Sequence, residues 1–318
     1  MEYQPKPKFI ERMKQLLDNE EDVKKFFEFS KTRPKKSIRV NTLKISSEKL
    51  KQRLDPKNWK IKQFPNYPEI MQIQGNLNPG EIGKTTEHLL GYYYVQEITS
   101  MMPIFALDPK PDELLLDLCA APGSKTTQAA ALMQNQGTII ANDLSIGRIK
   151  ILSANLERFG VTNTIITRHE GAELCERLKK LNIYFDKILV DAPCSGEGNI
   201  RVSPRTFLEW SEGLLKSLSR KQKQLAQKAL ELLKPNGIMI YSTCTHSPEE
   251  NELVVQHLIE NNNIEILPIN NLPIKTRPGI TKWNNKILHP DLKNCIRIYH
   301  HDNNMEGFFL CKIKKLEK

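Results

Sequence analysis

Residues 113–127 read ELLLDLCAAPGSKTT, an apolar run that ends in an acid and continues through a turn of small residues. The run ELLLDL (113–118) predicts a strand, and a helix is expected from about Lys125 to Met133. A strand, a small-residue turn and a helix in this order are typical of the ligand-binding corner of an open α/β sheet.

Six further apolar runs follow this corner and alternate with helical patterns. Strands are expected at 137–143, 163–167, 185–193, 237–244, 264–267 and 308–313, with helices at 146–159, 217–233 and 249–260. Short apolar strands separated by helices predict a parallel sheet that is covered on both faces. The sequence therefore predicts an α/β, Rossmann-like domain with a seven-stranded sheet.

The first 90 residues have a different pattern. A helix is expected over 8–30, strands at 37–43, 59–64 and 70–73, and a short helix at 49–54. These elements predict a small α+β domain over 1–90, followed by the larger domain over 91–318. The segment GYYYVQEITSMMPIFAL, which starts at Gly91, is interpreted as a linking helix.

The net charge is +10, and the excess of basic residues is concentrated near the N-terminus. Positions 1–60 hold 17 basic and 9 acidic residues, and the densest stretch contains Lys31, Arg33, Lys35, Lys36 and Arg39. A concentrated basic surface attracts phosphate backbones, although a merely solubilising face has the same composition. Charge alone leaves both interpretations of this basic region open.

Several classes of protein are excluded. No apolar run approaches the length of a membrane span, and MEYQPKPKFI lacks the apolar core of a signal peptide, so a cytoplasmic protein with no membrane partner is expected. No pair among the six cysteines has CxxC spacing, which argues against a zinc ribbon. The sequence His300-His301-Asp302 has no further ligand at a suitable spacing, so no metal is expected.

The turn after the first strand predicts a nucleoside-type cofactor. Small residues at Ala120–Gly123 allow a ligand to approach the backbone, and Asp143 lies 20 residues beyond Gly123. An acid at this distance commonly accepts hydrogen bonds from ribose hydroxyls. A dinucleotide fits less well because GxGxxG is absent, and GSKTT does not meet the P-loop pattern.

Two cysteines are candidates for chemistry. Cys194 and Cys244 each follow an apolar strand, in the polar, turn-forming segments APCSGEG and STCTHSPEE. Thiols at the mouth of a cofactor crevice are candidate nucleophiles, and Asp191 shares that mouth. His246, two residues after Cys244, is interpreted as a solvated loop histidine.

These segments resemble the RNA cytosine-C5 methyltransferases that include Fmu (Sun) and the NOP2/NSUN proteins. DLCAAPGSKTTQ, DAPCSGEG and YSTCTHSPEENE are similar to three hallmark segments of that family, and the likeness extends to SIRVNTLK, GYYYVQEITSMMP and EGFFLCKI. The length and layout look most like the compact archaeal members. The resemblance implies a class I methyltransferase fold, S-adenosylmethionine (SAM) as cofactor and an RNA-binding domain at 1–90.

The resemblance also implies roles for individual residues. Cys244 would be the nucleophile, Cys194 would assist product release, Asp191 would hold the cytosine, and Lys125 would give electrostatic help. The cofactor would be surrounded by Cys119, Ala120, Ala121, Pro122, Gly123, Ser124, Lys125, Asp143, Arg148, Glu170 and Asp191. Glu170 stands where the family usually has Asp.

Two thiols suit this chemistry for a physical reason. C5 of cytosine is a poor nucleophile, and addition of a thiolate at C6 makes it reactive toward a methyl sulfonium. The adduct must then break, and a second thiol can help it to do so. The base must also leave its stack to reach the cofactor.

Other functions remain open from the sequence. A non-catalytic RNA-binding assembly factor would use the same fold, while an adenine amino-methyltransferase would need Asn/Asp-Pro-Pro-aromatic where this chain has Asp191-Ala-Pro-Cys. In DNA cytosine methyltransferases the nucleophile resembles the position of Cys194. A monomer that methylates transfer RNA is the first expectation, with ribosomal RNA as the alternative.

Overall fold

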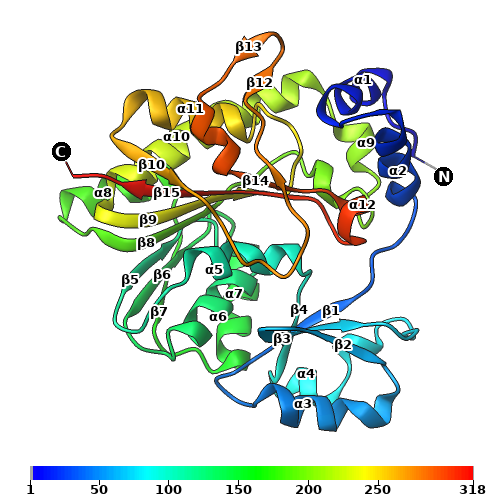
Figure 1. Ribbon diagram of the computed structural model, residues 1–318. Coiled ribbons are helices and arrows are strands. Elements are labelled where there is room, and N and C mark those ends of the chain that lie inside the picture. Colours follow the sequence, from blue (N-terminus) through cyan, green and yellow to red (C-terminus); the bar gives the residue numbers. More distant parts are fainter. Residues whose placement is uncertain (1–2, 318) are drawn as a thin grey trace.

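The computed structural model describes residues 3–317, and a nine-stranded sheet, the main sheet, runs through its larger part (Figure 1). The strands of this sheet are β5 (Leu114–Asp117), β6 (Thr138–Asn142), β7 (Thr164–Thr167), β8 (Phe185–Asp191), β9 (Leu233–Thr243), β10 (Ile264–Leu267), β11 (Arg277–Pro278), β14 (Ile296–Ile298) and β15 (Phe308–Lys315). Their order is β7-β6-β5-β8-β9-β15-β14-β11, and β10 pairs with the far end of β15.

All seven strands predicted for the larger domain lie in this sheet, which confirms the α/β, Rossmann-like fold. Strands β5 to β9 are parallel to their neighbours, whereas β15 is antiparallel to β9. The predicted strand count of seven was too low for the sheet as a whole, because β11 and β14 extend it beyond β15. These two strands have only two and three residues, too few to leave a periodic pattern.

Helices cover both faces of the main sheet, as parallel strands require. The apolar side chains of α8 (Gly171–Lys180), α10 (Glu212–Glu231) and α11 (Glu252–Asn261) pack on one face. Those of α5 (Met102–Leu107) and α6 (Ser124–Leu132) pack on the other face, and α7 (Ile146–Phe159) packs beside them. The carboxyl ends of the parallel strands therefore open between two helical layers.

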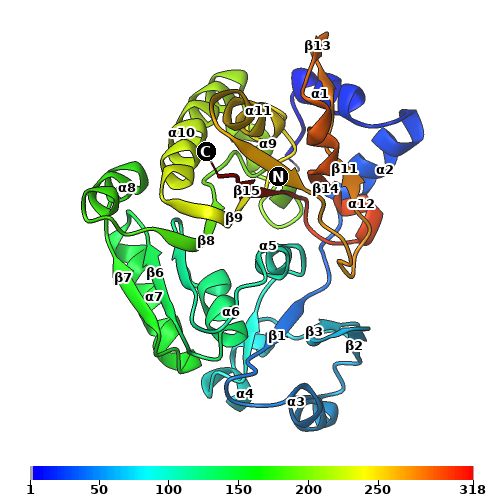
Figure 2. The ribbon, with the colours of Figure 1, turned by 60° about the vertical axis from the view of Figure 1, so that its left-hand side comes forward.

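A separate antiparallel sheet, the N-terminal sheet, lies below the main sheet in Figure 1 and beneath α5 and α6 in Figure 2. Its order is β2-β3-β1-β4, with β1 (Ser37–Val40), β2 (Ile61–Phe64), β3 (Tyr67–Ile73), β4 (Tyr93–Val95) and the covering helices α3 (Ser47–Leu54) and α4 (Thr86–Leu89). The linking helix predicted from Gly91 was wrong in its first part. Tyr93 and Val95 instead pair with β1.

The helix predicted over 8–30 is two helices, α1 (Pro7–Leu16) and α2 (Glu20–Ser30). The break falls at Asn19, whose side chain accepts a hydrogen bond from the Asp22 amide at 3.0 Å and so caps α2. Both helices pack against the larger domain through a cluster that includes Phe9, Phe26 and Trp210. In both ribbon views α2 lies beside α12, and both helices lie away from the N-terminal sheet.

The remaining elements are short. They are α9 (Thr206–Glu209), α12 (His300–Asn303), the hairpin β12 (Lys282–Trp283) and β13 (Lys286–Ile287), and 3-10 turns at Asp55–Lys57, Glu81–Gly83, Thr99–Met101, Glu197–Asn199 and Pro290–Asn294. Within residues 3–317, no helix has the length and apolar character needed to cross a membrane.

Candidate active site

The two candidate thiols meet. Cys194 follows β8 and Cys244 follows β9, and the parallel register places Asp191 opposite Ser242 at the ends of these strands. The two sulfur atoms lie 3.2 Å apart although the residues are 50 positions apart in the chain. Contact with Cys244 and burial raise the pKa of Cys194 well above its usual value, so Cys194 holds its proton at neutral pH.

An ion pair lies beside the sulfur atoms. The Nζ of Lys125 donates to Asp191 Oδ2 at 2.7 Å and to Ser100 Oγ at 3.0 Å. The hydroxyl of Ser242 donates to the other oxygen of Asp191 at 2.7 Å. Both oxygens of Asp191 therefore accept a hydrogen bond, one from a cation and one from a hydroxyl. The sequence did not indicate Ser100 or Ser242 as partners.

The turn after β5 has the tight geometry expected of a ligand-binding corner. The amide of Gly123 donates to Ala120 O at 2.8 Å, and Gly123 has a φ of 101°. A Cβ at Gly123 would lie 2.8 Å from the Leu152 side chain, so a larger residue would disturb α7 as well as the turn. Below the turn, burial raises the pKa of Asp117 to about 7, and Thr126 donates to its carboxyl group at 2.7 Å.

Asp143 and Arg148 connect the second strand to this turn. One oxygen of Asp143 accepts from the Ser145 amide at 3.0 Å, and the other lies 3.2 Å from the Arg148 guanidinium. Arg148 also donates to the carbonyl of Ala121. Glu170 caps α8, because its carboxylate accepts from the Glu173 amide at 2.9 Å. Glu170 stands where the family that the sequence resembles usually has Asp, so this position still carries a carboxylate.

Two cavities lie on either side of Arg148, which lines both. The first, here called the acidic cavity, has a volume of about 420 Å³ and is lined by Cys119, Asp143 and Glu170 together with Leu144, Ala172, Leu225 and others. The second, the thiol cavity, has a volume of about 510 Å³ and is lined by Cys244, Asp191 and Lys125. Cys194 contacts Cys244 but is not part of the thiol cavity wall.

The acidic cavity fits an adenosine-containing group. Its apolar side chains offer surfaces for a flat base. Asp143 offers a carboxylate to ribose hydroxyls, and an acid near this position commonly binds ribose in α/β nucleotide-binding folds. The predicted residues Cys119, Asp143, Arg148 and Glu170 all line it, while Ala121, Pro122, Ser124 and Lys125 line the thiol cavity. Ala120 and Gly123 line neither cavity, so the predicted set is divided between two spaces that share Arg148.

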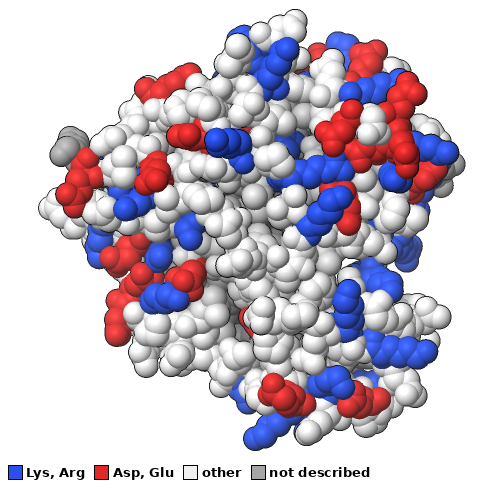
Figure 3. Space-filling model, in the orientation of Figure 1, with Lys and Arg blue, Asp and Glu red and all other residues white. Residues whose placement is uncertain are grey.

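The N-terminal sheet forms one wall of the thiol cavity. Residues 34–37 and 94–97 face Cys244 and Asp191 across it, and they include Lys35 and Lys36. Lys and Arg side chains gather at the right-hand margin of the N-terminal sheet in Figure 3. Both parts of the chain are thus needed to enclose the thiols.

Arg39 was predicted to belong to the basic surface, and the structure contradicts this. Its side chain is only 2% exposed, and it donates to Ser124 O at 2.5 Å and to Thr127 Oγ1 at 2.8 Å. It also donates to Gln96, so it joins the N-terminal sheet to the first turns of α6. Sequence charge alone could not distinguish this buried guanidinium from its exposed neighbours.

A buried network holds together the loops that carry Cys194 and Cys244, here called the thiol loops. The carboxylate of Glu250 accepts from the Ser195 amide at 3.0 Å, from the Ser195 hydroxyl at 2.5 Å and from Gln222 at 2.8 Å. Ser195 in turn contacts the Thr245 hydroxyl at 2.8 Å. Since Ser195 follows Cys194 and Thr245 follows Cys244, this network fixes the distance between the sulfur atoms. Burial raises the pKa of Glu250 to about 7.

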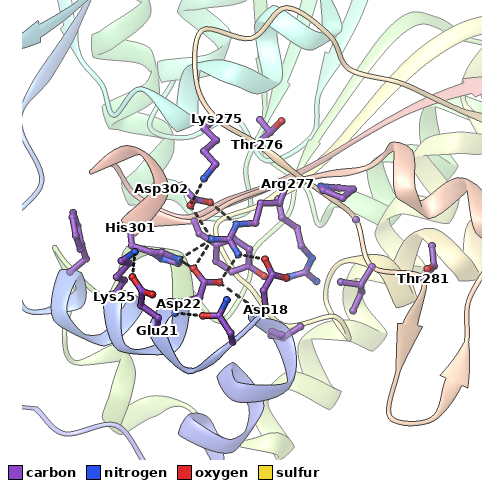
Figure 4. A pocket seen from close by; sticks show the side chains of 18 of the residues that line it. Asp18, Glu21, Asp22, Lys25, Lys275, Thr276, Arg277, Thr281, His301 and Asp302 are labelled. Atoms are coloured by element: carbon purple, nitrogen blue, oxygen red, sulfur yellow. Dashed lines mark hydrogen bonds and ion pairs between the residues drawn. The ribbon is translucent and has the colours of Figure 1, made fainter.

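The histidines differ from their predicted settings. His246 is 1% exposed and stacks on Tyr299, so the prediction of a solvated loop histidine was wrong. Asp22, distant in sequence, joins His301 and Asp302 in a cluster (Figure 4). The Arg277 guanidinium lies within this cluster, 2.6 Å from Asp22 and 2.7 Å from Asp302, and neutralises its acids.

Comparison with known proteins agrees with this geometry. A family model described as 16S rRNA methyltransferase RsmB/F matches residues 104–314, and one described as the N-terminal domain of 16S rRNA methyltransferase RsmF matches residues 6–98. The ribosomal RNA small subunit methyltransferase F of Vibrio cholerae is 38% identical over 316 residues, which are 98% of this chain and 64% of that protein. That of Vibrio campbellii is 36% identical over 312 residues, 97% of this chain and 63% of that protein. The chain thus spans less than two thirds of the length of these curated relatives.

Solved structures agree over the whole fold. A methyltransferase homolog from Pyrococcus horikoshii is 35% identical with a TM-score of 0.81, covering 98% of this chain and all of that one. NSun6 from the same organism, solved with SFG, shares the fold with a TM-score of 0.82 at 24% identity over 98% of this chain and 99% of that one. The family expected from the sequence is confirmed: the chain belongs to the RsmB/F (Fmu/Sun) family of SAM-dependent RNA cytosine-C5 methyltransferases.

Proposed function

We propose that this chain transfers a methyl group from SAM to C5 of cytosine in ribosomal RNA. The observation that supports this most directly is the 3.2 Å contact between Cys194 and Cys244, at a cavity that also holds Asp191 and Lys125. Two thiols and an ion-paired carboxylate suit a reaction in which a base is first activated by a sulfur and then released.

In this proposal Cys244 attacks C6 of the cytosine. Cys244 lines the thiol cavity, which supports this role, whereas Cys194 does not line it and has a raised pKa that keeps its thiol protonated. The carboxylate of Asp191 would accept a hydrogen bond from the exocyclic amine. Lys125 would hold Asp191 in position and place a positive charge in the cavity that Cys244 lines. After transfer, Cys194 would assist the departure of Cys244 from C6.

The cofactor would occupy the acidic cavity and extend toward the thiols past Arg148. When bound, SAM supplies an electrophilic methyl group. Asp143 would accept hydrogen bonds from the ribose, and Glu170 would contribute an acid at the rim. The turn Cys119–Ser124 would lie along the cofactor. Arg148 bonds both Asp143 and Ala121, so it would keep the two sides of the crevice in a fixed relation.

Ribosomal RNA is favoured over the transfer RNA first expected, because the curated relatives are named for the RNA of the small ribosomal subunit. The basic residues of 1–90, including Lys35 and Lys36 beside the thiol cavity, would hold phosphates of the RNA. A cytoplasmic location, a monomeric state and a domain division near residue 90 stay predictions.

Substitution of the two thiols tests the reaction. We expect Cys244→Ala to abolish transfer of labelled methyl from SAM to a 16S rRNA transcript. Cys194→Ala should accumulate a covalent protein–RNA adduct, seen as a slow band on a denaturing gel. Cys175→Ala, which removes a buried thiol of α8, serves as the matched control. Full turnover by Cys194→Ala without any adduct would contradict this division of roles.

Mapping of methylated sites tests the substrate. Bisulfite sequencing of total RNA from a strain without this gene should show the loss of a single class of 5-methylcytosine in 16S rRNA. Loss confined to transfer RNA would restore the first expectation. If the purified chain bound RNA but neither SAM nor a methyl acceptor, the non-catalytic assembly factor would be the better description.

A further inference from the structure

One acidic side chain of the thiol cavity has no partner in the arrangement described so far. Glu306 precedes β15, lines the cavity with Cys244 and Asp191, and is only 4% exposed. Among the described residues, neither oxygen of its carboxyl group has a hydrogen-bond partner. A buried polar group without a partner is costly, so such groups often await a ligand.

The backbone fixes Glu306 relative to the attacking sulfur. The Gly307 amide donates to Gly198 O at 2.9 Å, and the Gly198 amide donates to Cys244 O at 2.9 Å. Phe309, three residues after Glu306, pairs with Thr243, the residue before Cys244. A Cβ at Gly198 would lie 2.2 Å from Gly307 O, so the backbone at Gly198 and the backbone at Gly307 are too close to leave room for a side chain. Glu306 is therefore held beside Cys244 by rigid elements.

The surroundings keep Glu306 protonated. Burial is the main cause that raises its pKa to about 8, and the neighbouring Glu97 acts in the same direction. Arg201 and Lys36 oppose this effect without reversing it. At neutral pH the carboxyl group thus retains a hydrogen that it can donate, unlike the ion-paired Asp191.

We propose that Glu306 is a further catalytic residue, whose carboxyl group donates a hydrogen bond to O2 of the target cytosine. This inference rests on the proposed methyl transfer. Addition of the Cys244 thiolate forms the sulfur–C6 bond and moves the C5–C6 electron pair into the ring, where negative charge develops on N3 and O2. Asp191 already accepts hydrogen bonds from Lys125 and Ser242, whereas the carboxyl group of Glu306 has no partner among the described residues and can stabilise that charge as a donor. Transfer of the methyl group to C5 uses this charge. Loss of the C5 proton to water then re-forms the C5–C6 double bond, breaks the sulfur–C6 bond and releases Cys244.

The test compares Glu306→Gln, which keeps a donor, with Glu306→Ala, which removes it. Initial rates of labelled methyl transfer from SAM to a 16S rRNA transcript would be measured at saturation between pH 6.5 and 9.5. We expect Glu306→Ala to lower kcat roughly 100-fold, the usual effect of losing one such donor. Affinity for the transcript should stay within about threefold, because the hydrogen bond strengthens only as charge develops.

The pH profile separates a catalytic role from a structural one. In the unaltered chain kcat should fall above the pKa of Glu306, near pH 8, as the donor is lost. Glu306→Gln should retain a rate within about tenfold and lack this fall, since an amide does not ionise in this range. Thermal melts of both variants, with Glu265→Gln and Glu265→Ala at an exposed site of β10 as matched controls, report on folding.

The outcomes are distinct. Unchanged kcat in Glu306→Ala, or an unchanged alkaline fall in Glu306→Gln, would overturn the inference while leaving the proposed function intact. A kcat loss of the same size in both variants, matched by a lower melting temperature, would assign Glu306 a structural role. Absence of methyl transfer by the unaltered chain would contradict the proposed function itself, and the inference would fall with it.

Discussion

Replacement of Arg39 by alanine should destabilise the whole protein, although Arg39 lies in the most basic stretch of the sequence. The guanidinium of Arg39 is buried between β1 and α6 and donates to Gln96, Ser124 and Thr127. Burial lowers its pKa to about 9, which still leaves it charged at neutral pH. The substitution would leave three buried acceptors without their donor and would open a cavity.

The magnitude follows from these contacts. A hydrogen bond to a charged group contributes about 1.5–3 kcal/mol, and each buried acceptor that is left without a donor costs about 1–3 kcal/mol. We therefore expect Arg39→Ala to lower the free energy of unfolding by about 3–5 kcal/mol. Because one kcal/mol corresponds to about 2–4 °C in a chain of this size, Tm should fall by at least about 6 °C.

Urea denaturation followed by circular dichroism measures the change, with Lys35→Ala as the matched control. Lys35 is exposed and lines the thiol cavity, so its loss should change stability by less than about 0.5 kcal/mol. It should instead weaken RNA binding and reduce by about one the number of counterions released on binding, which is measured from the salt dependence of the affinity. The reasoning would be refuted if Arg39→Ala unfolded at the same urea concentration as the unaltered chain while losing RNA affinity as Lys35→Ala does.

Two further changes test how the thiol loops are held. Gly307→Ala would place a Cβ 2.4 Å from the His246 ring, so we expect a loss of about 1–3 kcal/mol in thermal melts and a larger loss of methyl transfer than of SAM affinity. Glu250 has its pKa raised to about 7 in the folded state, against about 4.5 when unfolded. Its contribution to stability is complete below pH 4.5 and is lost as pH rises through 7, by up to about 3 kcal/mol. Melts between pH 5 and 8 should show a smaller decline for Glu250→Gln than for the unaltered chain; equal declines would assign the pH dependence to other groups.

The fold of the larger domain could be predicted because its strands are continuous apolar runs. The runs of β5 and β8 are largely buried, and even β7 and β10, which are only partly buried, keep a short apolar run. The break between α1 and α2 was missed although Asn19 and the acids after it form a capping signal. The strand β4 was missed because Tyr93 and Val95 stand in a segment whose apolar residues also suit a helix.

The sequence predicted the site residues that belong to recognisable motifs, but not the residues that contact them from other parts of the chain. Cys194 and Cys244 could be placed together because parallel strands end at one edge of the sheet. The partners that tune them come from elsewhere: Ser100 precedes α5, and Glu250 lies in the loop before α11. Whether a charged residue such as Arg39 faces solvent or the interior depends on tertiary packing, which local charge density does not encode.

The attachment of the N-terminal sheet limits how this protein can open for an RNA. Because α1 and α2 are anchored on the larger domain, the sheet is covalently joined to it twice, once through residues 31–36 and again through residues 96–99. A motion that widened the entrance would be restrained by both connections and by the hydrogen bonds from Arg39 to Ser124 and Thr127 of α6. With two connections, the N-terminal sheet has a smaller range of motion relative to the main sheet than a domain that is joined through a single linker.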